Sequence, residues 1–157
     1  MTAIVTRSSG RYVLHLGKDE RALLARLLGE LRELVNDPVE SSVVRRLFPA
    51  VYPDDAEREA EYQRLMREDL VSSRLAAVDV VESVLGGSGR RVTLDDAQMQ
   101  AFVQSVNAVR LVLGTLLDVT EDEDAASPEL ASSPEYQLYA YLSWLLDSAI
   151  QAMSRDL

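Results

Sequence analysis

Apolar residues return at every third or fourth position through most of this 157-residue chain, and that repeat constrains its fold more than any other feature. Between Lys18 and Asn36, for example, Leu24, Leu27 and Leu31 fall on the same side of an α-helix. A helix of this length is marginal by itself in water, so its apolar side must pack against other elements. The repeat therefore predicts a bundle of amphipathic helices.

Prolines, glycines and an acidic stretch divide the repeat into separate helices. Residues 118–135 contain seven acidic residues, no basic residue and two prolines, which predicts a loop. The remaining pattern predicts a helical bundle within residues 18–153, with five to six helices depending on whether the third one breaks near Asp69. The predicted helices cover residues 18–36, 40–48, 54–85, 93–116 and 134–153, and the fourth of them begins at Thr93 or at Asp95.

Two short strands are expected before the first helix. Tyr12, Leu14 and Leu16 alternate onto one face of the second strand, and Gly10 can take the positive φ of a tight turn. We therefore predict an all-α fold, mainly a helical bundle, with a small N-terminal β-hairpin over residues 3–16. The length fits a single domain over residues 1–157.

Composition removes several classes of function. The chain has no cysteine and a single histidine, His15, which excludes thiol catalysis, disulfides, thiolate metal sites and histidine-rich metal centres. The net charge is −10, and residues 51–157 carry twenty acidic against eight basic side chains, so this part should repel a phosphate backbone. No segment resembles a signal peptide or is apolar over a length that spans a bilayer, which predicts a cytoplasmic protein.

No residue pattern indicates an enzyme. His15 lies in a predicted strand with no nucleophile motif beside it. The acidic run that begins at Asp118 has Glu123 at the sixth position, where a calcium-binding EF-hand loop requires glycine. The glycine-rich residues 86–89 follow a helix and lack the Gly-Lys-Ser/Thr of a phosphate-binding loop. We predict a non-enzymatic protein with no catalytic residue, no metal site and no cofactor.

Two charged residues interrupt strongly apolar helical runs. Asp79 follows Val78, and Arg110 follows Val109 on the helix whose apolar side is widest. A buried charge that lacks a partner costs several kcal/mol, roughly, so such residues are expected to pair. We predict a buried ion pair of Arg110 with Asp79, or with Glu82 as the alternative acid, that fixes the register of two helices.

A turn set by Pro49 and Pro53 places arginines beside aromatic residues. Tyrosine and arginine are enriched where proteins bind one another. A second arginine pair follows the glycine-rich residues 86–89 and could touch a partner as well. The predicted interaction surface consists of Arg45, Arg46, Phe48, Tyr52, Tyr62, Arg90 and Arg91.

The same turn admits a second interpretation, a helix-turn-helix that reads DNA. A recognition helix places its N-terminal residues against bases and phosphates. The helix that would fill this position begins with Asp54, Asp55 and Glu57, so its charge opposes DNA contact. Protein contact is favoured, and DNA contact is the alternative.

Several blocks of sequence, in order along most of the chain, resemble an actinobacterial family known as a domain of unknown function. Genes of this family commonly lie beside the gene of the ClpS adaptor, and some members are oxidative-stress transcriptional regulators of the AosR type. The blocks that carry the resemblance are Arg45-Arg46-Leu47-Phe48-Pro49-Ala50-Val51-Tyr52, Glu68-Asp69-Leu70, Arg74-Leu75-Ala76, Asn107, Arg110-Leu111-Val112-Leu113-Gly114-Thr115, Asp118-Val119-Thr120-Glu121-Asp122, Tyr139 and Leu142-Ser143-Trp144-Leu145.

The resemblance implies a cytoplasmic transcription-associated regulator that works through a protein partner, with a sigma factor or RNA polymerase as the suspected partner. Direct DNA binding and a role as an adaptor linked to Clp proteolysis are the alternatives. A last helix that is apolar on most sides also leaves a homodimer open. Because these residues include no cysteine, a thiol switch within them is excluded as the sensor of oxidative stress.

Overall fold

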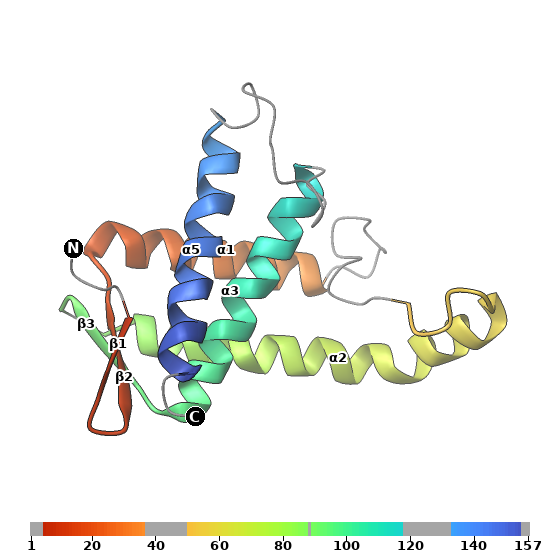
Figure 1. The fold of residues 1–157 in the computed structure, drawn as a ribbon. Helices are drawn as coiled ribbons and strands as arrows, with labels where there is room; N and C mark the ends of the chain where they lie inside the picture. The colour runs from red at the N-terminus through yellow and green to blue at the C-terminus, as the bar shows by residue number, and fades with distance from the viewer. Residues whose placement is uncertain (1–4, 37–49, 88, 118–132, 155–157) are drawn as a thin grey trace.

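In the computed structural model of the chain, residues 5–36, 50–87, 89–117 and 133–154 are described (Figure 1). These residues form four helices and a small antiparallel sheet of three strands, so the predicted mainly helical fold with an N-terminal hairpin is confirmed. The elements are β1 (Val5–Ser8), β2 (Arg11–His15), α1 (Lys18–Asn36), α2 (Ala56–Leu85), β3 (Arg91–Leu94), α3 (Asp96–Leu116) and α5 (Pro134–Ser154).

The sheet has the order β1-β2-β3, and its third strand was not predicted. We expected a helix to begin at Thr93 or Asp95; Thr93 pairs with Val13 of β2, and Asp95 is the N-cap of the helix, so the second alternative is confirmed. The alternation of buried Val92 and Leu94 with exposed neighbours is the pattern of a strand, and β2 offers it a free edge. Between β1 and β2 the chain turns through Ser9 and Gly10, both at positive φ.

The core lies where α3 crosses the other elements. Helix α3 contacts α1, α2 and α5 as well as strands β2 and β3, which agrees with its wide apolar side. Phe102 and Met99 of α3 are fully buried, and Leu14 of the hairpin and Leu142 of α5 are buried with them in the same cluster. The hairpin is therefore stabilised by packing on the helices rather than by its own two strands.

Helix α2 is thirty residues long and runs past Asp69 without the break that the sequence left open. Asp55 caps its first turn, with a carboxylate oxygen that accepts the backbone N–H of Arg58 at 3.2 Å. All of its buried residues lie in the second half of the helix: Ala77, Val78, Val81 and Leu85. The first half extends beyond the bundle (Figure 1). We call residues 50–70, which comprise the preceding turn and this first half, the arm.

Two predicted elements lie outside the described residues, the short helix 40–48 and most of the acidic loop 118–135. No helix in the described part of the chain is long and apolar enough to cross a membrane.

Candidate functional site

The tip of the arm is a turn that one carboxylate holds in shape. Oε1 of Glu59 accepts the backbone N–H of Val51 at 2.7 Å and that of Tyr52 at 2.9 Å. The N–H of Asp55 donates to the carbonyl of Tyr52 at 3.2 Å, which closes the turn onto the helix. The hydrogen bond from Tyr52, followed by one from the side chain of Gln63, lowers the pKa of Glu59 below its ordinary value. The turn is thus built by local contacts, without support from the bundle.

Aromatic and cationic side chains pack on the outside of this turn. The rings of Tyr52 and Tyr62 meet edge to face with centroids 6.2 Å apart, and the guanidinium of Arg58 lies 5.5 Å from the centre of the Tyr52 ring. Val51 and Tyr52 nevertheless remain 49% and 38% exposed. Val51 and Tyr52 thus form a small exposed apolar surface at the tip of the arm.

Beside the turn, the arm has a hollow of about 850 Å³ that is open to solvent. Small apolar residues, Pro53, Ala56 and Ala60, line part of it. Its polar wall is a row of side chains one helical turn apart, in which Gln63 donates to Glu59 at 3.0 Å and Arg67 donates to Gln63 at 3.4 Å. The hollow therefore combines an apolar floor with a fixed polar wall.

The structure brings together only some of the residues predicted for the interaction surface. Tyr52 and Tyr62 are in contact on the arm. Arg90 and Arg91 are exposed, but they lie at the far end of α2, about 45 Å away along a helix of thirty residues. Arg45, Arg46 and Phe48 lie outside the described residues. The predicted surface is thus divided between the two ends of one helix.

The predicted ion pair between Asp79 and Arg110 is not formed. Asp79 lies on the side of α2 that faces α1, where Arg32 reaches both Asp79 and Glu82, the second at 3.0 Å. The hydrogen bond to Asp79 is the main cause of a raised pKa for Arg32. Sequence reasoning missed Arg32, although two acids one turn apart on α2 were a signal that a cation would lie beside them.

Arg110 packs in a different part of the bundle. Its guanidinium donates to Oδ1 of Asn107 at 3.1 Å and lies 5.9 Å from the centre of the Tyr139 ring on α5. Its Nε is buried without a hydrogen-bond partner. Arg74, on the core side of α2, is half-buried, and this burial lowers its pKa. Both arginines lie within or beside the bundle rather than at a pocket with converging acids.

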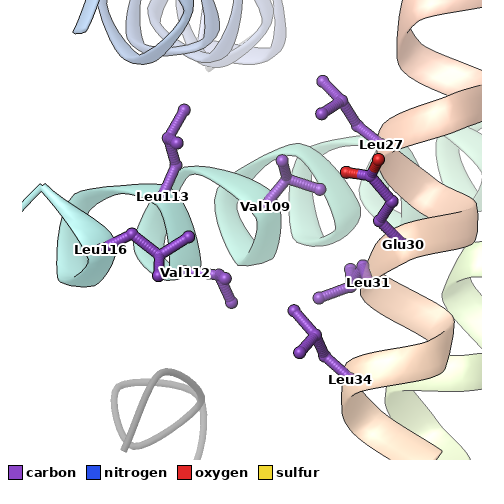
Figure 2. Close-up of a pocket in the computed structure, with 8 residues that line it drawn as sticks. All are labelled: Leu27, Glu30, Leu31, Leu34, Val109, Val112, Leu113 and Leu116. Carbon is purple, nitrogen blue, oxygen red and sulfur yellow. The ribbon is translucent and has the colours of Figure 1, made fainter. Parts of the chain in front are cut away.

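A small apolar pocket of about 90 Å³ lies between α1 and α3 (Figure 2). Its walls are leucine and valine side chains such as Leu31, Leu34, Val109 and Val112, and its polar member is Glu30. A single carboxylate has no second acid, base or nucleophile to act with there. The pocket can hold an apolar group, but the residues that line it do not form a catalytic site.

His15 and Glu20 each make a structural contact. Nε2 of His15 lies 3.3 Å from Oγ1 of Thr6 on the neighbouring strand. Tyr141 donates to Glu20 at 3.0 Å, and burial, with this hydrogen bond as the second cause, raises the pKa of the Tyr141 hydroxyl. Within the described ranges, no group of three or more histidine, aspartate or glutamate side chains is placed to hold a metal ion.

Fold and surface together define a mainly helical domain with a small sheet and an exposed arm. The chain belongs to the family described as a domain of unknown function, DUF2017, which matches residues 1–153. It is 24% identical over 190 residues to the putative oxidative stress regulator AosR of Mycobacterium leprae, covering 96% of this chain and 86% of that protein.

A second relative is the oxidative stress regulator AosR of Mycobacterium tuberculosis strain H37Rv. The two proteins are 24% identical over 151 residues, which cover 74% of this chain and 69% of the relative. No solved structure matches the fold. The family resemblance seen in the sequence is confirmed, and the relatives bear the names of regulators rather than of enzymes.

Proposed function

We propose that the protein is a non-enzymatic, transcription-associated regulator in the stress response and that it acts through protein–protein contact made by the arm. The observation that carries this proposal is the tip of the arm, where Val51 and Tyr52 are exposed while their backbone N–H groups donate to Glu59. A preformed apolar turn loses little conformational entropy on binding, and so favours affinity. The names of the relatives support the stress-related role.

The charge of the arm indicates the chemistry of the partner. Asp54, Asp55, Glu57 and Glu61 are all exposed around the turn and the first turns of α2. This concentration of acid opposes a phosphate backbone and favours a basic protein segment with an apolar anchor for the tip. A sigma factor or RNA polymerase is the partner that we propose, and its binding segment would be basic.

The signal must reach this regulator by a route other than thiol oxidation within these residues, because they contain no cysteine. The arm does not have to sense oxidative stress itself if the partner senses it, or if stress changes the amount of the regulator. We therefore assign to this chain the contact with the transcription machinery.

The test measures binding of the purified protein to purified sigma factors and RNA polymerase core from the same organism by fluorescence anisotropy. We expect Val51→Glu to weaken binding at least tenfold. The matched control is Ile150→Glu, which places the same charge at another exposed apolar position, on α5, and should leave affinity unchanged.

Two outcomes would contradict the proposal. Tight binding of duplex DNA by the protein alone, with a steep dependence on salt, would identify a direct DNA-binding regulator. Binding to purified ClpS or a Clp ATPase, with none to the transcription proteins, would identify a proteolytic adaptor.

A further inference from the structure

The side of α2 that faces away from the core carries a repeat of its own. Six positions follow one another at alternating intervals of four and three residues, which is the spacing of a coiled-coil seam. We call them the outer strip: Tyr62, Met66, Asp69, Ser73, Ala76 and Val80.

The fold itself does not use the outer strip. At 100° per residue the centre of the strip lies about 160° around the helix from the buried Val78, which faces the bundle. Met66 and Val80 are 37% and 38% exposed, and Leu65 beside them is 62% exposed. An apolar seam that holds one charged residue in six has the composition of an interface centre rather than of a solvated helix face.

We propose that the outer strip pairs with the outer strip of a second copy of this chain, with the two α2 helices antiparallel. A two-fold axis that passes the strip midway between Asp69 and Ser73 puts Tyr62 opposite Val80, and Met66 opposite Ala76. Each large side chain then meets a smaller one, as knobs-into-holes packing requires. A C2 interface of this kind must be complementary to itself, and these pairs fulfil that condition.

The same register gives the charged residue of the strip a partner. Asp69 lies opposite Ser73 of the second copy, and the hydroxyl of Ser73 can donate to the carboxylate. Both residues lie within one helical turn of the axis, where Ser72 and Ser73 have small side chains that let the helices approach closely. No other charged residue occupies the strip.

The distribution of charge selects the antiparallel orientation. The start of α2 is acidic, with Asp54, Asp55 and Glu57 exposed, and its far end adjoins the exposed Arg90 and Arg91. Antiparallel pairing brings the acidic start of each copy to the basic end of the other, whereas parallel pairing would place acid against acid. Arg90 and Arg91, which the sequence assigned to an interaction surface, would then face the acidic start of α2 in the second copy.

The length of the outer strip determines how much surface the proposed dimer can bury. From Tyr62 to Val80 the strip is about 27 Å long, and a helix pair of that length buries on the order of 1,000 Å² in total, near the lower limit of specific interfaces. We therefore infer a reversible dimer rather than a permanent one. The strip excludes Val51 and the residues that line the hollow, but Tyr62 and the acids at the start of α2 belong to both proposed surfaces. Met66 lies outside the tip and the hollow, so its variants test the pairing separately from the proposed function.

The absence of cysteine allows a direct test by disulfide cross-linking. Met66→Cys and Ala76→Cys variants are prepared separately, mixed, and oxidised mildly. We expect a covalent dimer in the mixture and little in either variant alone, because only opposite positions bring two Cα atoms within the roughly 7 Å that a disulfide allows. A mixture of Glu68→Cys with Ala76→Cys is the control for random collision, since Glu68 lies off the strip.

Cross-linking of Met66→Cys with itself, but not with Ala76→Cys, would overturn the antiparallel register. Sedimentation equilibrium provides the second measurement, on a monomer of 17.4 kDa. We expect a concentration-dependent shift to twice this mass, and a dissociation constant at least tenfold higher for Met66→Glu with an unchanged circular dichroism spectrum. A monomer at all concentrations up to about 1 mM, or a dimer that Met66→Glu leaves intact, would refute the proposal.

Discussion

The two halves of helix α2 share one backbone but are stabilised in different ways. The second half buries Val78, Val81 and Leu85 against the bundle, and Arg32 of α1 bridges its polar side. The first half contains no buried residue. Its ordering contacts come from neighbours in sequence, among them the Asp55 cap and the row of side chains that starts at Glu59. Tertiary packing holds one half, and local hydrogen bonding holds the other.

This contrast shows how a small domain can present a rigid surface away from its core. Residues 56–70 are rich in alanine, glutamate, arginine and leucine, which favour helix without tertiary support. The packed half provides the nucleus from which the helix continues outward. Apolar residues on the arm are thus free for contact with other molecules, whereas those in the second half are committed to stability.

Truncating one leucine in each half gives the largest expected difference. Leu85→Ala removes a side chain that is 8% exposed, so the free energy of unfolding should fall by about 2–4 kcal/mol. Leu65→Ala, the matched change at 62% exposure, should alter it by less than about 0.5 kcal/mol. Urea denaturation followed by circular dichroism measures both. Equal losses in the two variants would mean that the arm belongs to the cooperative core.

Removing two N-cap aspartates compares the arm with the core, because Asp55 caps the exposed start of α2 and Asp95 caps α3 at the centre of the bundle. Asp95→Ala at the capping box of α3, where the carboxylate accepts the N–H of Gln98 at 2.8 Å, should cost about 1 kcal/mol of global stability. Asp55→Ala should instead fray the arm and leave global stability almost unchanged. Amide hydrogen exchange distinguishes these results, since only the first turns of α2 should lose protection in Asp55→Ala. A global loss of protection in that variant would contradict the comparison.

The helices and the hairpin could be predicted because their signals are local. Alternation in Tyr12, Leu14 and Leu16 and the apolar repeat of α1 and α3 are visible in short windows of sequence. Strand β3 was missed because residues 91–94 directly precede the helix-start signal at Asp95, and only pairing with β2 distinguishes them from the first turn of that helix. The sequence also did not show that the first half of α2 extends beyond the bundle, since periodicity identifies a helix but not which part of it packs against other elements.

The candidate site was predictable to a smaller extent. Tyr52 and Tyr62 were assigned to a surface from residue type and the proline turn, and both are found on the arm. The partner of Asp79 was assigned wrongly, because its neighbours in sequence are apolar and suggested burial. In fact its side chain is 64% exposed and faces α1. Which helix lies beside a charged residue is decided by packing over long separations in sequence, and a single sequence does not show it.

Arg32 tests how far the contact between α1 and the second half of α2 depends on charge. Its side chain and those of Asp79 and Glu82 are partly exposed, so Arg32→Met should cost at most about 1 kcal/mol of stability. Raising the salt concentration to about 1 M should weaken the wild type but not the variant, because salt screens the ion pairs. Arg26→Met is the control, since Arg26 is exposed on the same helix. Equal losses in both variants would show that side-chain packing of arginine, rather than charge, holds the two helices together.

The smallest expected effect concerns the turn at the tip of the arm and its response to pH. Hydrogen bonds from Tyr52 and Gln63 lower the pKa of folded Glu59, so the carboxylate stabilises the turn fully above the ordinary glutamate pKa of about 4.3. This stabilisation should be lost as the pH falls through the lowered value, when the protonated oxygen becomes a poorer acceptor. Protection of the Val51 and Tyr52 amides, measured by hydrogen exchange, should therefore decrease at acid pH in the wild type while α3 stays protected. Glu59→Gln should show the loss at every pH, and Glu68→Gln should behave like the wild type. A turn that keeps its protection in Glu59→Gln would show that the two prolines, rather than the carboxylate, determine its shape.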